Sequence, residues 1–179
     1  MVSKFWGFVA ASALVAVPAA SLAQFSETEA NNTFATGNFF DRSLFGGTGA
    51  IAIDGHISAG DVDFFRFDFF AGDFIAVMVA TPDPDSEDTI LGIFAPDGSI
   101  FDTDDDDGPG FNSAWSGTIP SDGRWGIAVS GFSDFDFVGR HEQEFDYKLV
   151  IGMNPVPEPA TMTAVAAGLA ALALRRRKK

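Results

Sequence analysis

The stretch that decides the fold is DVDFFRFDFF, which runs from Asp61 to Phe70. Phe65, Phe67 and Phe69 alternate with polar residues, so in an extended chain these three large apolar side chains share one face. Strict alternation over such a length is typical of a β-strand that is buried on one side. The stretch therefore predicts a strand in a sheet that covers a hydrophobic core.

The same alternation recurs on both sides of this stretch, between turns rich in Gly, Asp and Pro. The other predicted strands cover residues 49–57, 74–80, 89–95, 99–101, 113–119, 124–130 and 145–151. Asp97-Gly98 separates two of them and is a typical hairpin turn. Residues 24–47 and 132–144 lack the period and are predicted to be loops. About eight short strands without a helical period indicate an all-β fold, an antiparallel sandwich of two sheets.

Residues 1–23 have the features of a secretory signal peptide. Lys4 supplies the positive charge, residues 5–17 are apolar, and Ser21-Leu22-Ala23 matches a small-x-small cleavage site. We expect the apolar part to form a signal helix, the Sec machinery to export the chain, and cleavage to follow Ala23. The alternative is a buried N-terminal helix, but no amphipathic segment follows it.

Residues 155–179 combine three features in a fixed order. Pro157-Glu158-Pro159 precedes the apolar run 160–174, and five cations that include Arg175, Arg176 and Arg177 end the chain. Fifteen apolar residues are fewer than the roughly 17–25 that usually span a membrane, but terminal Arg and Lys can snorkel. We expect a short transmembrane helix with its cations in the cytoplasm and the sandwich outside. The alternative is a C-terminal core helix, for which the cluster of cations is unsuited.

This tail resembles the PEP-CTERM sorting signal, through the Pro-Glu-Pro triplet, the apolar run and the Arg cluster. The resemblance implies processing by an exosortase in a Gram-negative bacterium that makes exopolysaccharide. It also implies a precursor anchored transiently in the inner membrane and a mature form at the cell surface or outside the cell.

Residues 24–154 are similar to the bacterial pre-peptidase C-terminal (PPC) family. The stretches that carry the resemblance are ETEANNTFATGN from Glu27, GDVDFFRFDF from Gly60, DTILGIFAPDGS from Asp88, GTIPSDGRWGIAVSG from Gly117 and YKLVIG from Tyr147. Members of this family have a jelly-roll-like sandwich and are commonly appended to secreted proteases and other hydrolases. Because no catalytic domain is recognised beside the sandwich, an accessory role here would require a separately encoded hydrolase.

The charge of residues 24–154 limits the partners of the predicted domain. This segment holds 24 acidic and five basic residues, a net charge of −19. Such a charge repels nucleic acid and attracts cations, so no nucleic-acid partner is expected. The chain has no Cys, so an exported fold must be held by its hydrophobic core or by a bound metal rather than by disulfides.

The candidate metal is calcium. Glu27, Glu29 and Asn31 are two residues apart, so their oxygens face the same way in an extended segment. Ca²⁺ takes about 6–8 oxygen ligands, and Asp61 and Asp63 are the expected partners. The spacing resembles the Glu-x-Glu-x-Asn-Asp calcium site of collagen-binding members of the PPC family. The predicted ligands are Glu27, Glu29, Asn31, Asn32, Asp61 and Asp63. The alternative is a solvated acidic edge that discourages aggregation.

A second candidate calcium site is the acidic stretch DTDDDDGPG, with Asp104 and Asp106 as ligands. Adjacent carboxylates repel one another unless a cation or water screens them. The stretch does not match an EF-hand, because Gly108 falls one place late and Ser113 replaces the bidentate Glu. The alternative is a solvated loop.

Catalytic motifs are not recognised in this sequence. The two imidazoles, His56 and His141, have no metal-ligand spacing, and no G-x-S-x-G or thiol nucleophile occurs. We therefore expect a non-enzymatic protein with a structural or adhesive role in exopolysaccharide or biofilm. The alternative is a carbohydrate- or protein-binding accessory module that works with a separate secreted hydrolase, and an unrecognised hydrolase is the third reading. Trp115, Trp125 and Tyr147 are candidate sugar-binding aromatics. Trp125 and Tyr147 lie on the apolar faces of their strands, which favours packing in the core, and the pattern does not assign Trp115 to either role.

Overall fold

The structure is a computed structural model that describes residues 22–46 and 49–155. The predicted signal helix and transmembrane helix, with the Pro-Glu-Pro triplet and the Arg cluster, lie outside these ranges. Within them, no helix is long and apolar enough to cross a membrane.

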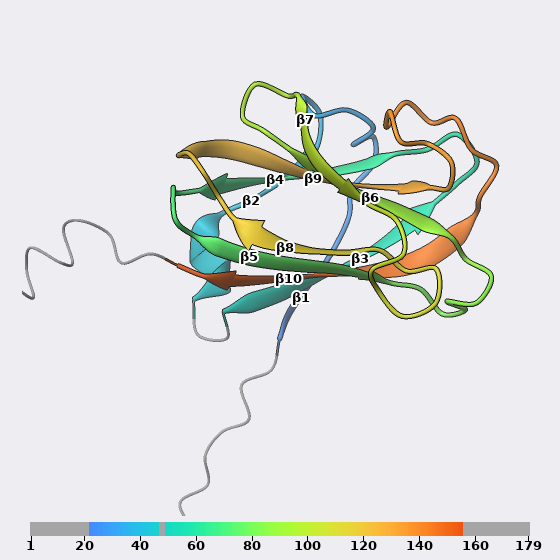
Figure 1. Cartoon of the computed structure of the whole chain (residues 1–179), viewed down its shortest axis with the longest axis horizontal. Helices are drawn as coiled ribbons and strands as arrows, with labels where there is room; N and C mark the ends of the chain where they lie inside the picture. Colours follow the sequence, from blue (N-terminus) through green and yellow to red (C-terminus); the bar gives the residue numbers. More distant parts are fainter. Residues whose placement is uncertain (1–21, 47–48, 156–179) are drawn as a thin grey trace, which may run out of the picture.

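Two sheets of five strands pack face to face as a sandwich (Figure 1). The first sheet has the strand order β1 (Ala23–Ser26), β3 (Ala50–Ile57), β10 (Phe145–Asn154), β5 (Phe74–Ala80), β8 (Ala114–Thr118). The second has the order β2 (Asn38–Phe40), β4 (Asp63–Phe69), β9 (Gly123–Gly131), β6 (Thr89–Phe94), β7 (Ile100–Asp104). A short 3₁₀ helix, η1 (Arg42–Phe45), precedes β3. The all-β sandwich predicted from the alternation is confirmed.

The sheets are mixed, so the prediction of a wholly antiparallel sandwich is wrong for two strand pairs. β1 runs parallel to β3, and β2 runs parallel to β4. The chain visits the other sheet between the members of each pair, which gives it the crossover that parallel neighbours need. β2 and all of β1 except Ala23 lie in the segment 24–47, which was predicted to be a loop. They have four and three residues, too few for a period of two to stand out.

The space between the sheets is filled by the alternating side chains. Phe65, Phe67 and Phe69 are at most 2% exposed, and the rings of Phe67 and Phe69 stack 5.5 Å apart. Phe67 is paired in register with Trp125 of β9, which is also buried in the core. At about 25 cal/mol per Å² of buried apolar surface, such large aromatic rings are the main source of stability in a chain without disulfides.

The outer face of the second sheet is covered by segments that were predicted to be loops. Phe64 and Phe94 point away from the main core and contact each other with ring centroids 4.9 Å apart. Phe137, from the segment after β9, packs edge-on against Phe94 at 5.3 Å. Residues 132–144 therefore bury a second, smaller hydrophobic cluster although they form no strand.

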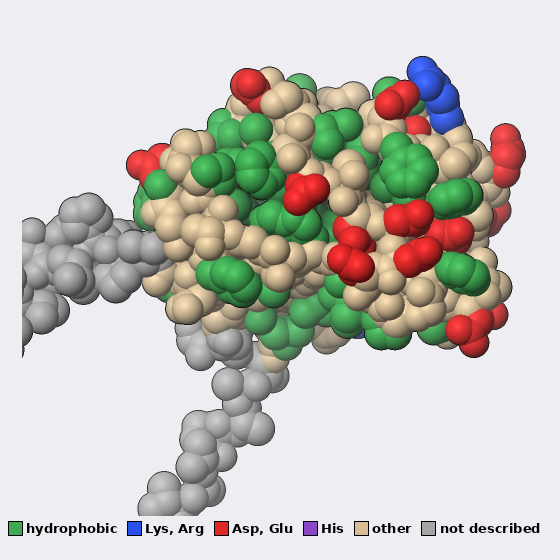
Figure 2. Space-filling model, viewed as in Figure 1, with side chains coloured by type: hydrophobic (Ala, Val, Ile, Leu, Met, Phe, Trp, Pro, Cys, Tyr) green, Lys and Arg blue, Asp and Glu red, His purple; other side chains and the backbone are tan. Residues whose placement is uncertain are grey.

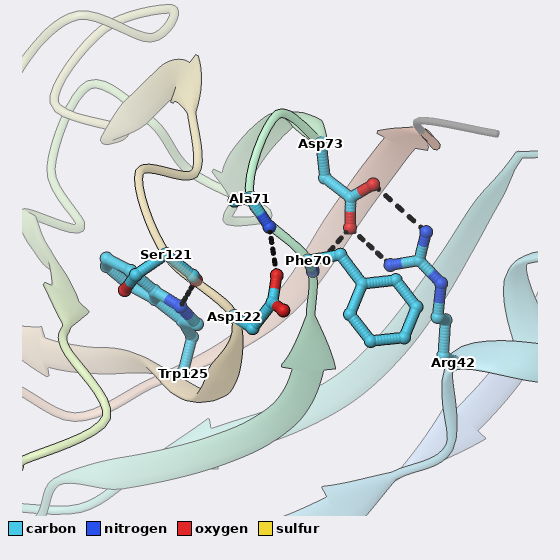
Figure 3. Close-up of polar contacts among 7 residues, drawn as sticks. All are labelled: Arg42, Phe70, Ala71, Asp73, Ser121, Asp122 and Trp125. Atoms are coloured by element: carbon cyan, nitrogen blue, oxygen red, sulfur yellow. Dashed lines mark hydrogen bonds and ion pairs between the residues drawn. The ribbon is translucent and has the colours of Figure 1, made fainter. Parts of the chain in front are cut away.

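Polar contacts hold the end of the sandwich where β4 turns into β5 (Figure 3). The guanidinium of Arg42 binds both carboxylate oxygens of Asp73, with Nη2 3.0 Å from Oδ1. The same guanidinium lies over the ring of Phe70, 4.4 Å from its centroid. Asp73 also accepts a hydrogen bond from the Phe70 N–H, at 2.8 Å. The Ala71 N–H donates to Asp122 at 2.8 Å, which connects this turn to the one before β9.

Candidate metal centre

Three carboxylates meet at the point where the chain leaves β1 and enters β4. Oxygens of Glu27, Glu29 and Asp63 all lie within 4.8 Å of one another. Glu27 continues the parallel pairing of β1 with β3, because its N–H donates to the Asp54 carbonyl at 3.0 Å. Asp63 is the first residue of β4 and is fully buried. The cluster therefore joins the edge of one sheet to an inner strand of the other.

The Asn31 side chain completes this cluster. Asn31 is fully buried, and its amide lies 3.1 Å from Glu29 Oε2 and 3.0 Å from Asp63 Oδ1. With its nitrogen turned toward these oxygens, the amide donates to both carboxylates. With its oxygen turned toward them, it adds a fourth oxygen to the group, which is the donor type that calcium prefers.

Tyr147 of β10 contacts two of the three carboxylates through its hydroxyl group. Its hydroxyl lies 2.7 Å from Asp63 Oδ2, to which it donates, and 3.3 Å from Glu27 Oε2. The ring occupies the space above Gly55, where a Cβ would come within 2.3 Å of the Tyr147 Cζ atom. Burial and the nearby Asp63 carboxylate raise the pKa of Tyr147 well above its ordinary value, so the hydroxyl stays a donor. The inward orientation of Tyr147 follows the predicted alternation, whereas its contact with the carboxylates was not predicted.

The cluster carries more negative charge than its surroundings neutralise. Burial, and then the hydrogen bond and charge of Glu27, raise the pKa of Asp63 to about 10. The basic side chains of the described residues are engaged elsewhere: Arg42 with Asp73, Arg124 with Asp68, Arg140 with Asp136, Lys148 with Asp54, and Arg66 with the Gly37 carbonyl. The charge must therefore be neutralised by bound protons or by a cation. Three carboxylates and an amide oxygen are hard donors that fit calcium.

Asn32 and Asp61, the other two predicted ligands, lie outside this cluster. The Asn32 amide donates to Asp61 Oδ1, which also accepts from the Val62 N–H at 2.9 Å. The Asp61 carbonyl lies 2.7 Å from Nε2 of the buried His141. These contacts hold the loop that leads into β4 and bind the Asp61 carboxylate to Asn32 and to the Val62 N–H.

A second acidic cluster forms beside β6. Oxygens of Asp88, Asp105 and Asp106 lie within 4.8 Å of one another. One oxygen each of Asp88 and Asp105 is buried without a hydrogen-bond partner. Burial and then the Asp106 charge raise the pKa of Asp105 to about 6. The cluster includes Asp106 from the predicted pair, and Asp88 was not predicted because it lies far from the acidic stretch in sequence.

Asp104, the other predicted ligand of the acidic stretch, has a different set of contacts. Its Oδ2 accepts from the Ala114 N–H at 2.7 Å and from the Asp107 N–H at 3.3 Å. The first contact bridges the end of β7 to the start of β8. Burial is the main cause that raises the pKa of Asp104.

Comparison with known protein families identifies the sorting signal at the C-terminal end of the sequence. The model of the PEP-CTERM protein-sorting motif matches residues 155–178. The chain carries a PEP-CTERM sorting motif. The resemblance of the tail is thereby confirmed, and the PEP-CTERM motif marks an exported protein that an exosortase processes. No curated protein matches the chain.

Several solved structures are similar to the PEP-CTERM chain at low sequence identity. PliG of Aeromonas hydrophila, a periplasmic inhibitor of g-type lysozyme, is 15% identical with a TM-score of 0.49, over 74% of this chain and 100% of that one. The pre-peptidase C-terminal domain of a Bacillus anthracis collagenase is 11% identical with a TM-score of 0.44, over 66% and 94% of the two chains.

The two imidazoles of the PEP-CTERM chain take part in separate contacts. His56 Nδ1 lies 2.8 Å from Asp146 Oδ1 at the exposed surface of β3 and β10. His141 is buried, and its Nδ1 accepts from the Gln143 N–H at 3.2 Å while Nε2 faces a carbonyl. His56 lies near the carboxylate cluster, since its backbone N–H donates to Glu27 Oε1 at 2.6 Å.

Proposed function

We propose that the chain is an exported, non-enzymatic protein of the cell surface or extracellular matrix, with a β-sandwich stabilised by calcium. Its role is structural or adhesive, within the exopolysaccharide that surrounds the cell. The sorting motif supports export, and the net charge of −19 between residues 24 and 154 supports residence among divalent cations.

The observation that carries this proposal is the meeting of Glu27, Glu29 and Asp63 within 4.8 Å around a fully buried carboxyl group. These three carboxylates would hold the calcium ion, with the Asn31 amide oxygen as a further ligand. A bound ion supplies the positive charge that the buried carboxylates lack. Since Glu27 extends β1 and Asp63 begins β4, binding would tie the two sheets together at this end.

Calcium would matter most for the first strand of the mature protein. β1 begins at Ala23, the last residue of the predicted signal peptide, and among the strands that the structure describes it pairs with β3 alone. Cleavage after Ala23 would leave three residues of this strand, Gln24 to Ser26, before the carboxylates. Such a short edge strand frays easily, and an ion at Glu27 and Glu29 would fix its end.

The test is a thermal melt of the full chain, kept in solution by a mild detergent, with calcium and with a chelator. A ligand at about 100 times its Kd adds about 2.7 kcal/mol of stability. We expect calcium to raise the Tm of the wild type and of the Asp61→Asn variant, because Asp61 lies outside the cluster. We expect the Asp63→Asn variant to fold in chelator and to lose the response to calcium. A calcium response that is unchanged in Asp63→Asn would refute the assignment, whereas a smaller response that disappears when Asp88→Asn is added belongs to the second acidic cluster.

The stoichiometry of binding separates the two acidic clusters. Calorimetric titration with calcium should give one ion that depends on Asp63. A second ion that is lost in the Asp88→Asn variant would be assigned to Asp88, Asp105 and Asp106, where two buried oxygens lack partners. Fractionation of cells tests the location: we expect the mature protein, without its basic tail, in the surface or exopolysaccharide fraction. An intact chain confined to the cytosol would contradict the proposal.

A further inference from the structure

The side of the sandwich where β7 and β8 are the edge strands contains a hollow of about 510 Å³. Its volume falls in the range of roughly 300–1,000 Å³ that is usual for small-molecule sites. The residues that line it are Ala76, Val77, Asp102, Asp107, Ala114 and Trp115, with Ser116. We call this hollow the β7–β8 groove.

Trp115 is anchored at this groove by a hydrogen bond and by packing against the core. Its indole N–H donates to Asp102 Oδ2 at 2.9 Å, so a strand of the opposite sheet fixes the ring. The six-membered part of the indole covers Gly117, where a Cβ would lie 2.6 Å from the Trp115 Cζ2 atom. The side chain remains partly exposed and contributes to the lining. A fixed aromatic ring binds a flat apolar surface at little cost in conformational entropy.

The polar side of the groove consists of acceptors. Asp102 and Asp107 supply carboxylates and Ser116 supplies a hydroxyl, and no Lys or Arg is among the described residues that line it. Figure 2 shows acidic and hydrophobic side chains together in the region where Figure 1 places β7 and β8. The negative charge disfavours anionic ligands, while the carboxylates accept hydrogen bonds from hydroxyl groups.

We infer that the β7–β8 groove binds an uncharged glycan chain. One sugar ring stacks its apolar C–H face on Trp115, and its hydroxyl groups donate to Asp102 and Asp107. An aromatic platform beside convergent acceptors complements a molecule with an apolar face and a rim of hydroxyl donors. The inference depends on the proposed surface role in one respect: that role makes the matrix exopolysaccharide the natural source of the glycan. It gives the surface protein a means of holding matrix polysaccharide that does not require calcium.

The test is calorimetric titration of the full chain, in mild detergent, with hexamers of glucose, mannose, galactose and N-acetylglucosamine, and with an oligogalacturonate as the anionic probe. We expect binding of at least one neutral hexamer and none of the oligogalacturonate. Trp115→Ala should weaken the binding about tenfold or more, and Trp115→Phe should weaken it less. Phe135→Ala is the control, because Phe135 is exposed on the segment after β9 and is not part of the groove lining.

A charge variant distinguishes a ligand contact from a packing role. Asp102→Asn with Asp107→Asn should allow the oligogalacturonate to bind, because the two repelling charges are gone. Packing of Trp115 alone would not produce this change in preference. Binding that is equal in wild type and Trp115→Phe and Trp115→Ala, or no response to any neutral hexamer, would overturn the inference. Each titration is repeated in chelator, so a failure of calcium binding is seen separately from a failure of glycan binding.

Discussion

Replacement of Asp73 by Ala is expected to destabilise the sandwich far more than replacement of Asp68 by Ala. The two sites are chemically matched. Arg42 binds Asp73 and covers the Phe70 ring, and Arg124 binds Asp68 with its guanidinium carbon 4.3 Å from the centroid of the Phe39 ring. They differ in burial, and burial decides what an unpaired charge costs.

The magnitude follows from the exposed fractions of the side chains. Asp73 is 0% exposed and Arg42 is 17% exposed, whereas Arg124 and Asp68 are 47% and 43% exposed. Removing one partner of a buried pair costs about 3–5 kcal/mol. Because Arg42 still reaches water and keeps the Phe70 ring, we expect the lower end of this range, about 3 kcal/mol. The exposed pair is screened by water, so Asp68→Ala should leave the stability close to that of the wild type.

Urea unfolding followed by tryptophan fluorescence measures the difference. With an m-value of roughly 2 kcal/mol/M, the Asp73→Ala midpoint should fall by about 1.5 M. Adding Arg42→Met to Asp73→Ala should recover part of the loss, because the positive charge that Asp73 neutralises in the wild type is then removed as well. Equal midpoints for Asp73→Ala and Asp68→Ala would refute the reasoning from burial. A double variant less stable than Asp73→Ala would show that packing of Arg42, rather than its charge, is what matters.

Three further outcomes are expected. In chelator, the stability of the wild type should decline as pH rises above about 4. The reason is that folded Asp63 keeps a proton that the unfolded chain, in which the Asp pKa is 3.8, has released. Urea unfolding at pH 5 to 8 should show this decline in the wild type and its loss in Asp63→Asn. Gly55→Ala should cost about 1–3 kcal/mol and weaken calcium binding by displacing Tyr147, while Gly152→Ala, whose Cβ meets no atom closer than 3.8 Å, should be nearly neutral in a thermal melt. Asp134→Ala should cost about 2–3 kcal/mol, measured in urea, because this buried carboxylate accepts hydrogen bonds from one hydroxyl and two backbone N–H groups of its own loop.

Strands that are buried on one face could be predicted well. Each of the eight predicted strands has a counterpart in the structure, and the faces assigned to Phe65, Trp125 and Leu149 are those that pack in the core. The Asp97-Gly98 hairpin is confirmed by the bond from the Ala95 N–H to the Ser99 carbonyl, at 2.9 Å. These features are local, because a period of two and a turn dipeptide act over a few neighbouring residues.

The candidate site could be predicted only in part. The order Glu27, Glu29, Asn31 predicted that three members of the cluster lie together, because they are neighbours in one segment. Of the two later acids, only Asp63 belongs to the cluster, since the Asp61 carboxylate accepts hydrogen bonds from Asn32 and from the Val62 N–H. Asp61 lies in the turn before β4 and Asp63 is the first residue of the strand, so their spacing does not fix the directions of the two side chains, and the sequence could not choose between them.

The PEP-CTERM sorting motif and the alternation of the strands were determined by the sequence alone, because short linear patterns carry them. The packing of the two sheets decided the rest. It set the parallel pairing of β1 and β2, and it brought Asp88 to Asp105 and Trp115 to Asp102. These partners lie on strands and loops that are distant in the chain, and their distances depend on how the sheets are stacked. The physical reason is that a carboxylate cluster or a groove between sheets exists only after the hydrophobic core has brought its walls together.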